Sequence, residues 1–245
     1  SDSVTVKGLF QERRQYRVPF CQRHYVWNQK AQWEPLWQDI TEKAEGRLVP
    51  LESSPPHFLG AIVLELQHKN GLKGVETFHV IDGQQRLTTL QYLLTALALI
   101  VRERKIEDLY PVVETFTRNN NPDMMNDPTS EIYKVWPTFP DRPAFIAAMT
   151  AETRDALRQS FPQSFTNNGD LRKIGCKHPP ALEAIWFFAK QIDQWLVLQD
   201  DHGNSLEKLS VAILHDLKLV DITLEKDDDA QVIFETLNAR GTALR

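Results

Sequence analysis

Two kinds of hydrophobic pattern alternate along the first third of the chain. Runs rich in β-branched and aromatic residues at 16–20, 57–66 and 76–81 predict short strands. Pro19 restricts the first run to a sheet edge or a strand end, because proline cannot donate to a ladder. An Asn-Gly pair between the second and third runs is typical of a hairpin connection. The pattern therefore predicts several strands, two of which pair as a hairpin.

Apolar residues at helical spacing predict three longer helices. The first begins near Trp33, because Pro35 is tolerated only in a first turn. The second follows Arg86 directly, and the third opens at Pro179-Pro180. Each has an apolar stripe that is expected to face a core. The stripes are Trp33, Leu36, Trp37 and Ile40; Leu87, Leu90, Leu94, Leu97 and Val101; and Leu182, Ile185, Ala189, Ile192 and Leu196.

The rest of the pattern suggests how the chain is divided. From about residue 110 the chain is polar and rich in Asn and Pro, with short helical segments around 141–160. Towards the end, a helix leads into a strand, and an acidic cluster predicts the start of a last helix with Gly241 beyond its end. We interpret these parts as an α/β (α+β) core at 1–109, a helical insertion or lobe at 110–205, and a return to the core at 206–245.

Composition indicates an ordinary globular protein, with 42% hydrophobic and 25% charged residues. No uninterrupted apolar run reaches the roughly 18 residues of a membrane-spanning helix. The first ten residues lack the basic and apolar regions of a signal peptide. We therefore expect a cytoplasmic protein.

The cysteine content and the net charge exclude few classes of function. Two distant cysteines argue strongly against a disulfide framework or a cysteine-rich zinc site, and we interpret Cys21 as a packing residue. The net charge of −5 argues against a uniformly basic nucleic-acid binder, although residues 1–50 carry +2 and the remainder −7. The basic side chains near the start suit a solvated edge as well as a phosphate-contacting face. They are Arg13, Arg14, Arg17, Arg23 and His24.

The most informative segment is Asp82-Gly83-Gln84-Gln85-Arg86, where a predicted strand passes into a predicted helix. A helix N-terminus offers free N–H groups and a positive dipole end, which suit phosphate. Gly83 allows close approach of a ligand, Arg86 can bind phosphate oxygens bidentately, and Asp82 can bind Mg²⁺. Gln84 and Gln85 can orient a water or read a base edge. Alternatively, Asp82 is only the helix N-cap and the two glutamines are solvated.

A second segment, near the end of the chain, contains a carboxylate, an amide and an arginine. Glu235 and Asn238 share a face of the predicted helix, and Arg240 and Gly241 follow at its exit. These groups can complete a phosphate–metal site. They equally suit a surface helix with a glycine C-cap.

A third segment, at 18–27, interleaves aromatic and polar side chains. Such a mixture suits base stacking combined with backbone contacts to nucleic acid. It also suits a core-anchored edge with a few solvated polar groups. The residues concerned are Phe20, Gln22, Arg23, His24, Tyr25 and Trp27.

Four short stretches in this order resemble the N-terminal domain of GmrSD-type modification-dependent (type IV) restriction proteins. They are "VPFCQRHYVW", "FLGAIVL", "VIDGQQRLTTL" and "FETLNARGTAL". This ParB-like group has a D-G-Q-Q-R signature and includes phosphorothioate-sensing phage-defence proteins. The resemblance covers 16–104 and 215–245, and it implies a ParB/sulfiredoxin-like core of a small mixed sheet and helices with a helical lobe. The family usually has an aromatic residue where Cys21 stands.

The resemblance also implies a function. It implies that the domain binds and hydrolyses a nucleoside triphosphate, commonly GTP, with Mg²⁺, and couples this to sensing modified DNA in antiphage restriction. A separate C-terminal HNH-type nuclease domain commonly cuts, and we expect this chain to be a fragment that lacks it. The implied catalytic residues are Asp82, which also binds the metal, Gln84, Gln85 and Arg86. The implied nucleotide-binding residues are Gly83, Arg86, Glu235, Asn238, Arg240 and Gly241, and the implied DNA-sensing residues are Gln22, Arg23 and Tyr25.

Two other functions remain open from the sequence. The basic and aromatic residues at 13–27 also suit a DNA-binding module without turnover. A ParB-like metal-dependent DNase, with Asp82 and Glu235 as metal ligands, is the third possibility.

Overall fold

The computed structural model describes residues 2–49, 54–69, 71–173, 175–225, 228–229, 232–233 and 235–236. Within these ranges six strands form one mixed sheet in the order β1-β6-β3-β4-β2-β5. The strands are β1 (Asp2–Thr5), β2 (Arg14–Arg17), β3 (His57–Gln67), β4 (Glu76–Asp82), β5 (Val135–Trp136) and β6 (Leu217–Leu224).

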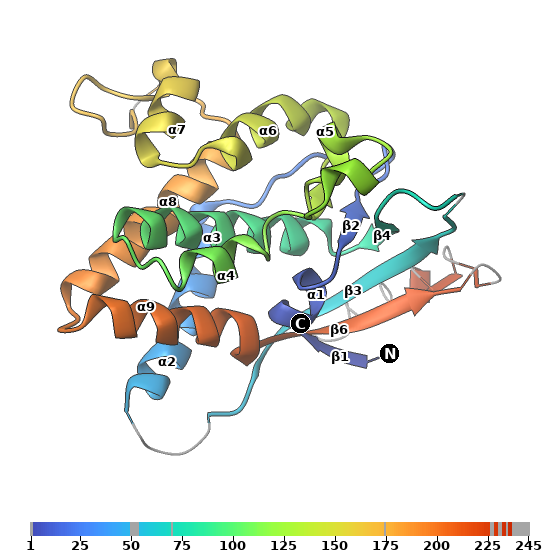
Figure 1. The fold of residues 1–245 in the computed structure, drawn as a ribbon, viewed down its shortest axis with the longest axis horizontal. Helices are drawn as coiled ribbons and strands as arrows, with labels where there is room; N and C mark the ends of the chain where they lie inside the picture. Colours follow the sequence, from blue (N-terminus) through green and yellow to red (C-terminus); the bar gives the residue numbers. More distant parts are fainter. Residues whose placement is uncertain are drawn as a thin grey trace.

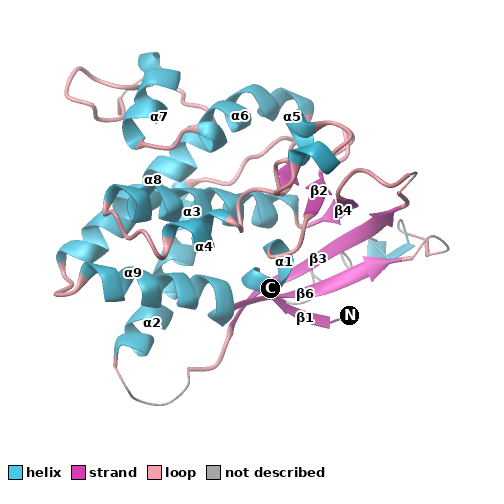
Figure 2. Cartoon of the chain, in the orientation of Figure 1, coloured by secondary structure: helices cyan, strands magenta, loops and turns pink. Residues whose placement is uncertain are grey.

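Helices gather beside this sheet, at the left of the view and above the long strands β3 and β6 (Figures 1 and 2). They are α1 (Val6–Phe10), α2 (Glu34–Leu48), α3 (Gln84–Glu103), α4 (Tyr110–Glu114), α5 (Pro128–Glu131), α6 (Arg142–Thr150), α7 (Arg154–Ser160), α8 (Pro180–Val197) and α9 (His202–Val211). A π-helical turn, Gln29–Trp33, precedes α2, and another, Ala212–Asp216, follows α9. The predicted α/β class is therefore confirmed. None of the helices in the described ranges is long and apolar enough to cross a membrane.

Strand directions bring three chain segments to one edge of the sheet. β2 lies between β4 and β5 and is parallel to both. β3 is antiparallel to β4 and parallel to β6, and β1 is antiparallel to β6. The carboxyl ends of β4, β2 and β5 therefore lie together, beside the amino end of β3. Ligands bind preferentially at such carboxyl edges in α/β proteins.

The central helix is α3, which is buried around its whole circumference. The predicted stripe from Leu87 to Val101 is buried, but so are side chains on the opposite side such as Tyr92 and Leu99. The reason is that α8 packs along α3, while α4 and β5 contact it elsewhere. A helix that is apolar all round is a core helix. The apolar pattern predicted one buried face, and tertiary packing buries the rest of the helix.

The predicted hairpin is confirmed, since β3 and β4 pair antiparallel. β2 covers 14–17, so Pro19 lies just beyond its end. The pattern did not predict β5, which is only two residues long and pairs with β2. The polar chain before it is anchored to β2 by the side-chain amide of Asn119, whose Nδ2 donates to the carbonyl of Arg14 at 3.0 Å. The proposed division into a core and a lobe stays a prediction.

Candidate functional site

The turn between β4 and α3 depends on Gly83. Its backbone has φ 95° and ψ 12°, a left-handed conformation that glycine adopts without strain. A Cβ at this position would lie 2.7 Å from Cγ2 of Ile62 on β3. Gly83 is the N-cap of α3 and, among the residues that the structure describes, no side chain caps the helix, so the alternative reading of Asp82 as N-cap is wrong. Asp82 instead accepts the N–H of Gly83 through Oδ1 at 2.9 Å.

Arg86 lies over β3 from the first turn of α3. A register irregularity in β3 places Gly60 at φ 110°, where a Cβ would come within 3.0 Å of Nη2 of Arg86. Nη1 of Arg86 donates to the carbonyl of Ala61 at 2.7 Å, and the guanidinium lies 5.9 Å from the ring centroid of Trp27. Burial lowers the pKa of Arg86, and the nearby charge of Asp82 opposes that shift. A guanidinium still remains charged at neutral pH, so Arg86 brings a fixed cation to the edge.

Gln84 and Gln85 bind protein backbone. They are only 8% and 7% exposed, so the reading of both as solvated first-turn residues is wrong. Nε2 of Gln84 donates to the carbonyl of Arg23 at 2.7 Å, and Oε1 of Gln85 accepts the N–H of Val26 at 2.8 Å. Nε2 of Gln85 donates to the carbonyl of His24 at 3.1 Å. The two amides therefore hold the segment that follows β2 against the start of α3.

Of the three residues predicted to sense DNA, the structure exposes one. The side chain of Arg23 is on the surface. Gln22 is half-buried, and its Nε2 donates to the carbonyl of Ile81 at the end of β4 at 2.7 Å. Tyr25 is a core residue, 3% exposed, with its hydroxyl 2.6 Å from Oγ1 of Thr89, and burial raises its pKa. Gln22 and Tyr25 are thus placed to position this segment, and their role in sensing stays a prediction.

Two aromatic side chains are exposed at or beside this segment: Phe20, which the sequence indicated for stacking, and Phe139, which it did not indicate. Phe20 is 96% exposed and Phe139 is 77% exposed. They belong to neighbouring segments, because the N–H of Tyr25 donates to Oδ2 of Asp141 at 2.8 Å. The guanidinium of Arg142 lies 5.7 Å from the ring centroid of Phe139. We call Phe20, Arg23, His24, Phe139 and Arg142 the aromatic–basic surface.

Only part of this surface could have been found from the sequence. The stretch "PTFPDRP" follows β5, and a strand of two residues leaves no periodic signal. The packing role suggested for Cys21 is wrong, since this side chain is exposed.

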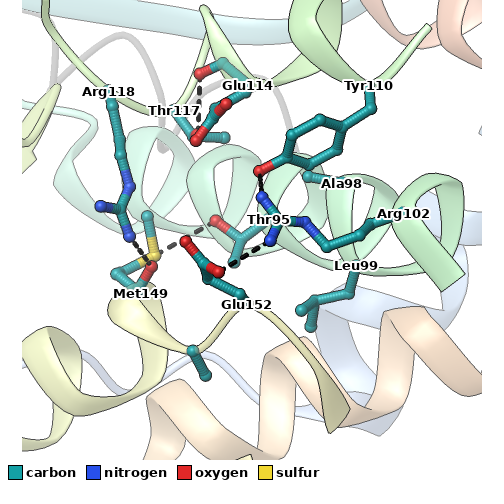
Figure 3. A pocket seen from close by; sticks show the side chains of 11 residues that line it. Thr95, Ala98, Leu99, Arg102, Tyr110, Glu114, Thr117, Arg118, Met149 and Glu152 are labelled. Atoms are coloured by element: carbon teal, nitrogen blue, oxygen red, sulfur yellow. Dashed lines mark hydrogen bonds and ion pairs between the residues drawn. The ribbon is translucent and has the colours of Figure 1, made fainter. Parts of the chain in front are cut away.

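A pocket beside the C-terminal half of α3 is too small for a ligand (Figure 3). Its volume of about 30 Å³ suits a single water molecule. Its polar groups bind one another: Arg102 donates to Glu152 and to the hydroxyl of Tyr110, and Arg118 donates to the carbonyl of Met149. These pairings give the pocket a structural role.

The C-terminal segment, which was predicted to contribute residues to the nucleotide site, is described only in part by the structure. Glu235 is exposed and lies in a helical stretch, and the N–H of Ile233 bonds to the carbonyl of Asp229, as the predicted helix start requires. Asn238, Arg240 and Gly241 lie outside the described residues.

For a metal, the described ranges contain no group of three His, Cys, Asp or Glu side chains that could hold an ion. Mg²⁺ in nucleotide sites is commonly held by one or two carboxylates together with the substrate phosphates. A single carboxylate at Asp82, beside an uncapped helix end, fits that arrangement. It does not fit a closed site made by protein groups alone.

These features define a mixed α/β protein with a candidate ligand site where parallel strands end and a glycine turn opens a helix. The sequence model of the GmrSD restriction endonuclease N-terminal domain matches residues 6–245, and the chain belongs to this family. The predicted resemblance is therefore confirmed, and the domain is a module of a restriction system. A comparison with curated proteins found no match.

Proposed function

We propose that this domain binds and hydrolyses a nucleoside triphosphate, with GTP as the expected substrate, and couples turnover to the sensing of modified DNA in antiphage restriction. The observation that carries the proposal is the cation of Arg86 and the carboxylate of Asp82 on either side of the uncapped start of α3. Anionic phosphate, a helix end and an arginine are complementary.

In this proposal each group has a defined role. The N–H groups at the start of α3 and the guanidinium of Arg86 bind phosphate oxygens, and Asp82 would hold Mg²⁺ together with the triphosphate. Bound Mg²⁺ would neutralise charge on the phosphates. Water adds across the terminal phosphoanhydride bond to give the diphosphate and inorganic phosphate. Positive charge near the leaving oxygen stabilises the negative charge that develops there, and the guanidinium of Arg86 supplies this positive charge.

The two glutamines connect this site to its surroundings. Because Gln84 and Gln85 bind the backbone after β2, they are positioning residues in the described conformation. Their predicted catalytic role requires one amide to leave its backbone partner when substrate binds. Glu235, Asn238, Arg240 and Gly241 remain proposed members of the same pocket.

The aromatic–basic surface is the proposed contact for DNA. Exposed aromatic rings stack on bases, and arginine side chains neutralise phosphates. Arg23 contributes directly, whereas Gln22 and Tyr25 shape the segment from beneath. In a full-length protein, a C-terminal nuclease domain would act on the DNA that this module recognises.

Phosphate release from GTP and ATP, with and without modified DNA, tests the proposal. We expect Arg86→Ala and Asp82→Ala to abolish release. Arg118→Ala is a matched control, because Arg118 also donates to a backbone carbonyl (Met149, 2.8 Å) but lies away from the site. If wild-type and Arg86→Ala proteins release phosphate at the same background rate, the triphosphatase function is wrong.

A second candidate function is a DNA-binding module without turnover, favoured by the exposure of Phe20 and Phe139. Salt-dependent DNA binding with no thermal shift on adding nucleotide would support it. The DNase alternative gains no support from the described residues, which hold no group of three metal-ligating side chains. Plasmid left uncut in Mg²⁺ or Mn²⁺ would remove it.

A further inference from the structure

A pocket of about 210 Å³ opens beside Arg86, between α3, α2 and the amino end of β3. Its walls are mainly apolar, from Trp27, Leu36, Leu59 and Leu90. Pockets for whole small-molecule ligands are usually about 300–1,000 Å³. This pocket is therefore the size of a subsite for one ring system, with the guanidinium of Arg86 on its wall.

The polar groups of this pocket are few. Asp39, on α2, places Oδ2 3.0 Å from Nε2 of His57 at the start of β3. Among the described residues that line the pocket, Asp39 is the one carboxylate, and Gln32 supplies an amide. In the described part of the chain, no hydrogen bond engages the other oxygen, Oδ1. His57 thus fixes the carboxylate while leaving an acceptor for a ligand.

We propose that this pocket holds the base of the nucleoside triphosphate and that Asp39 selects guanine. The inference rests on the proposed function, because Arg86 would bind the phosphates next to the pocket. An ionised carboxylate only accepts hydrogen bonds. Guanine presents two adjacent donors, N1–H and the N2 amine, to such a group, whereas adenine presents an acceptor at N1. The apolar walls and the indole of Trp27 accommodate the flat ring.

Direct binding measurements with GTP, ITP and ATP in Mg²⁺ test the inference. We expect the wild-type protein to bind GTP about tenfold or more tightly than ATP, as expected for a hydrogen bond to a charged group. ITP lacks the N2 amine and should fall between them. Asp39→Asn should remove most of this preference and leave ATP affinity nearly unchanged, which also shows that the variant is folded.

Glu65→Gln is the matched control. Glu65 also lies near a histidine, with Oε2 3.8 Å from Nδ1 of His79, and the exposures of the two pairs are similar. It lies at the other end of β3, away from the pocket. This variant should keep the wild-type preference for GTP.

The possible failures are distinguishable. Equal affinities for GTP and ATP, or a preference kept by Asp39→Asn, would overturn the base-selecting role of Asp39 and leave triphosphate binding intact. Absence of binding by any nucleotide would overturn the proposed function as well. A guanine-containing single-stranded oligonucleotide that competes through Asp39 more strongly than GTP would place a DNA base in the pocket and refute the assignment to the free nucleotide.

Discussion

Oε1 of Gln85 accepts the backbone N–H of Val26 at 2.8 Å, joining the first turn of α3 to the segment that follows β2. The same oxygen accepts the N–H of Trp27 at 3.2 Å. Trp27 lines the pocket beside Arg86, while the aromatic–basic surface begins a few residues earlier in the same segment. One buried amide therefore connects the candidate nucleotide site to the candidate DNA surface.

Gln85→Ala should loosen that segment. The N–H groups of Val26 and Trp27 lose their acceptor, and we expect a loss of about 1–3 kcal/mol in the free energy of unfolding. Urea unfolding measures the loss, and hydrogen exchange should accelerate at these two amides. Gln67→Ala is the control, because the amide of Gln67 donates to the carbonyl and the carboxylate of Glu65 within β3 and is not bonded to the segment after β2 in the described part of the chain. Unchanged exchange at Val26 would contradict the contact.

Two glycine-to-alanine variants should change stability in opposite directions. Gly83→Ala puts a Cβ 2.7 Å from Cγ2 of Ile62 at a positive φ, so we expect a loss of about 1–3 kcal/mol. Gly46→Ala, in α2, meets nothing within 4 Å and should gain up to about 1 kcal/mol. Urea midpoints of the two variants would be compared with wild type. A Gly83→Ala variant as stable as wild type, or more stable, would show that the turn does not need glycine.

Local patterns predicted the elements that carry strong periodicity. The stripe of α3 and the runs that became β3 and β4 could be identified because each is long enough to repeat. The segment around Asp82 could be identified because its residue types are unusual between a strand and a helix. Its ordered neighbours then indicated the family.

Local sequence patterns could not predict the contacts that tertiary packing makes. The amides of Gln84 and Gln85 meet residues 23–26 only because β2 and β4 pair in parallel across about 60 residues of chain. Tyr25 and Phe20 are both aromatic residues in one loop, yet packing buries the first and exposes the second. The sequence alone does not show which of two such aromatic residues faces the core and which faces solvent.

Lys134 should make stability depend on pH in the alkaline range. It is 2% exposed, burial lowers its pKa to about 8, and its Nζ donates to the carbonyl of Glu12 at 2.7 Å. The unfolded chain, with a lysine pKa of about 10.4, then binds more protons than the folded protein between about pH 8 and pH 10. The contribution of Lys134 to the free energy of unfolding therefore rises with pH across this window.

Lys134→Met isolates this effect. At pH 7 it removes a buried charge that costs about 3 kcal/mol and a hydrogen bond that contributes about 1 kcal/mol, so we expect a gain of about 2 kcal/mol. The gain should shrink as pH approaches 10. Urea unfolding at several pH values measures it, with Lys190→Met, at an exposed position of α8, as control. A gain that does not vary with pH would contradict the buried charge.

Phe139→Ala should weaken DNA binding while leaving the fold intact, because the ring is 77% exposed and packs little against the core. Stacking of one base on an aromatic side chain is worth about 1–3 kcal/mol, which corresponds to roughly a 5- to 150-fold loss of affinity. Arg142→Gln should instead reduce the slope of log affinity against log salt by about one phosphate contact. Fluorescence anisotropy with modified and unmodified oligonucleotides at several salt concentrations measures both effects. Leu72→Ala, at a side chain that is 95% exposed but remote from this edge, should change neither, and equal losses in the Phe139 and Leu72 variants would place DNA elsewhere.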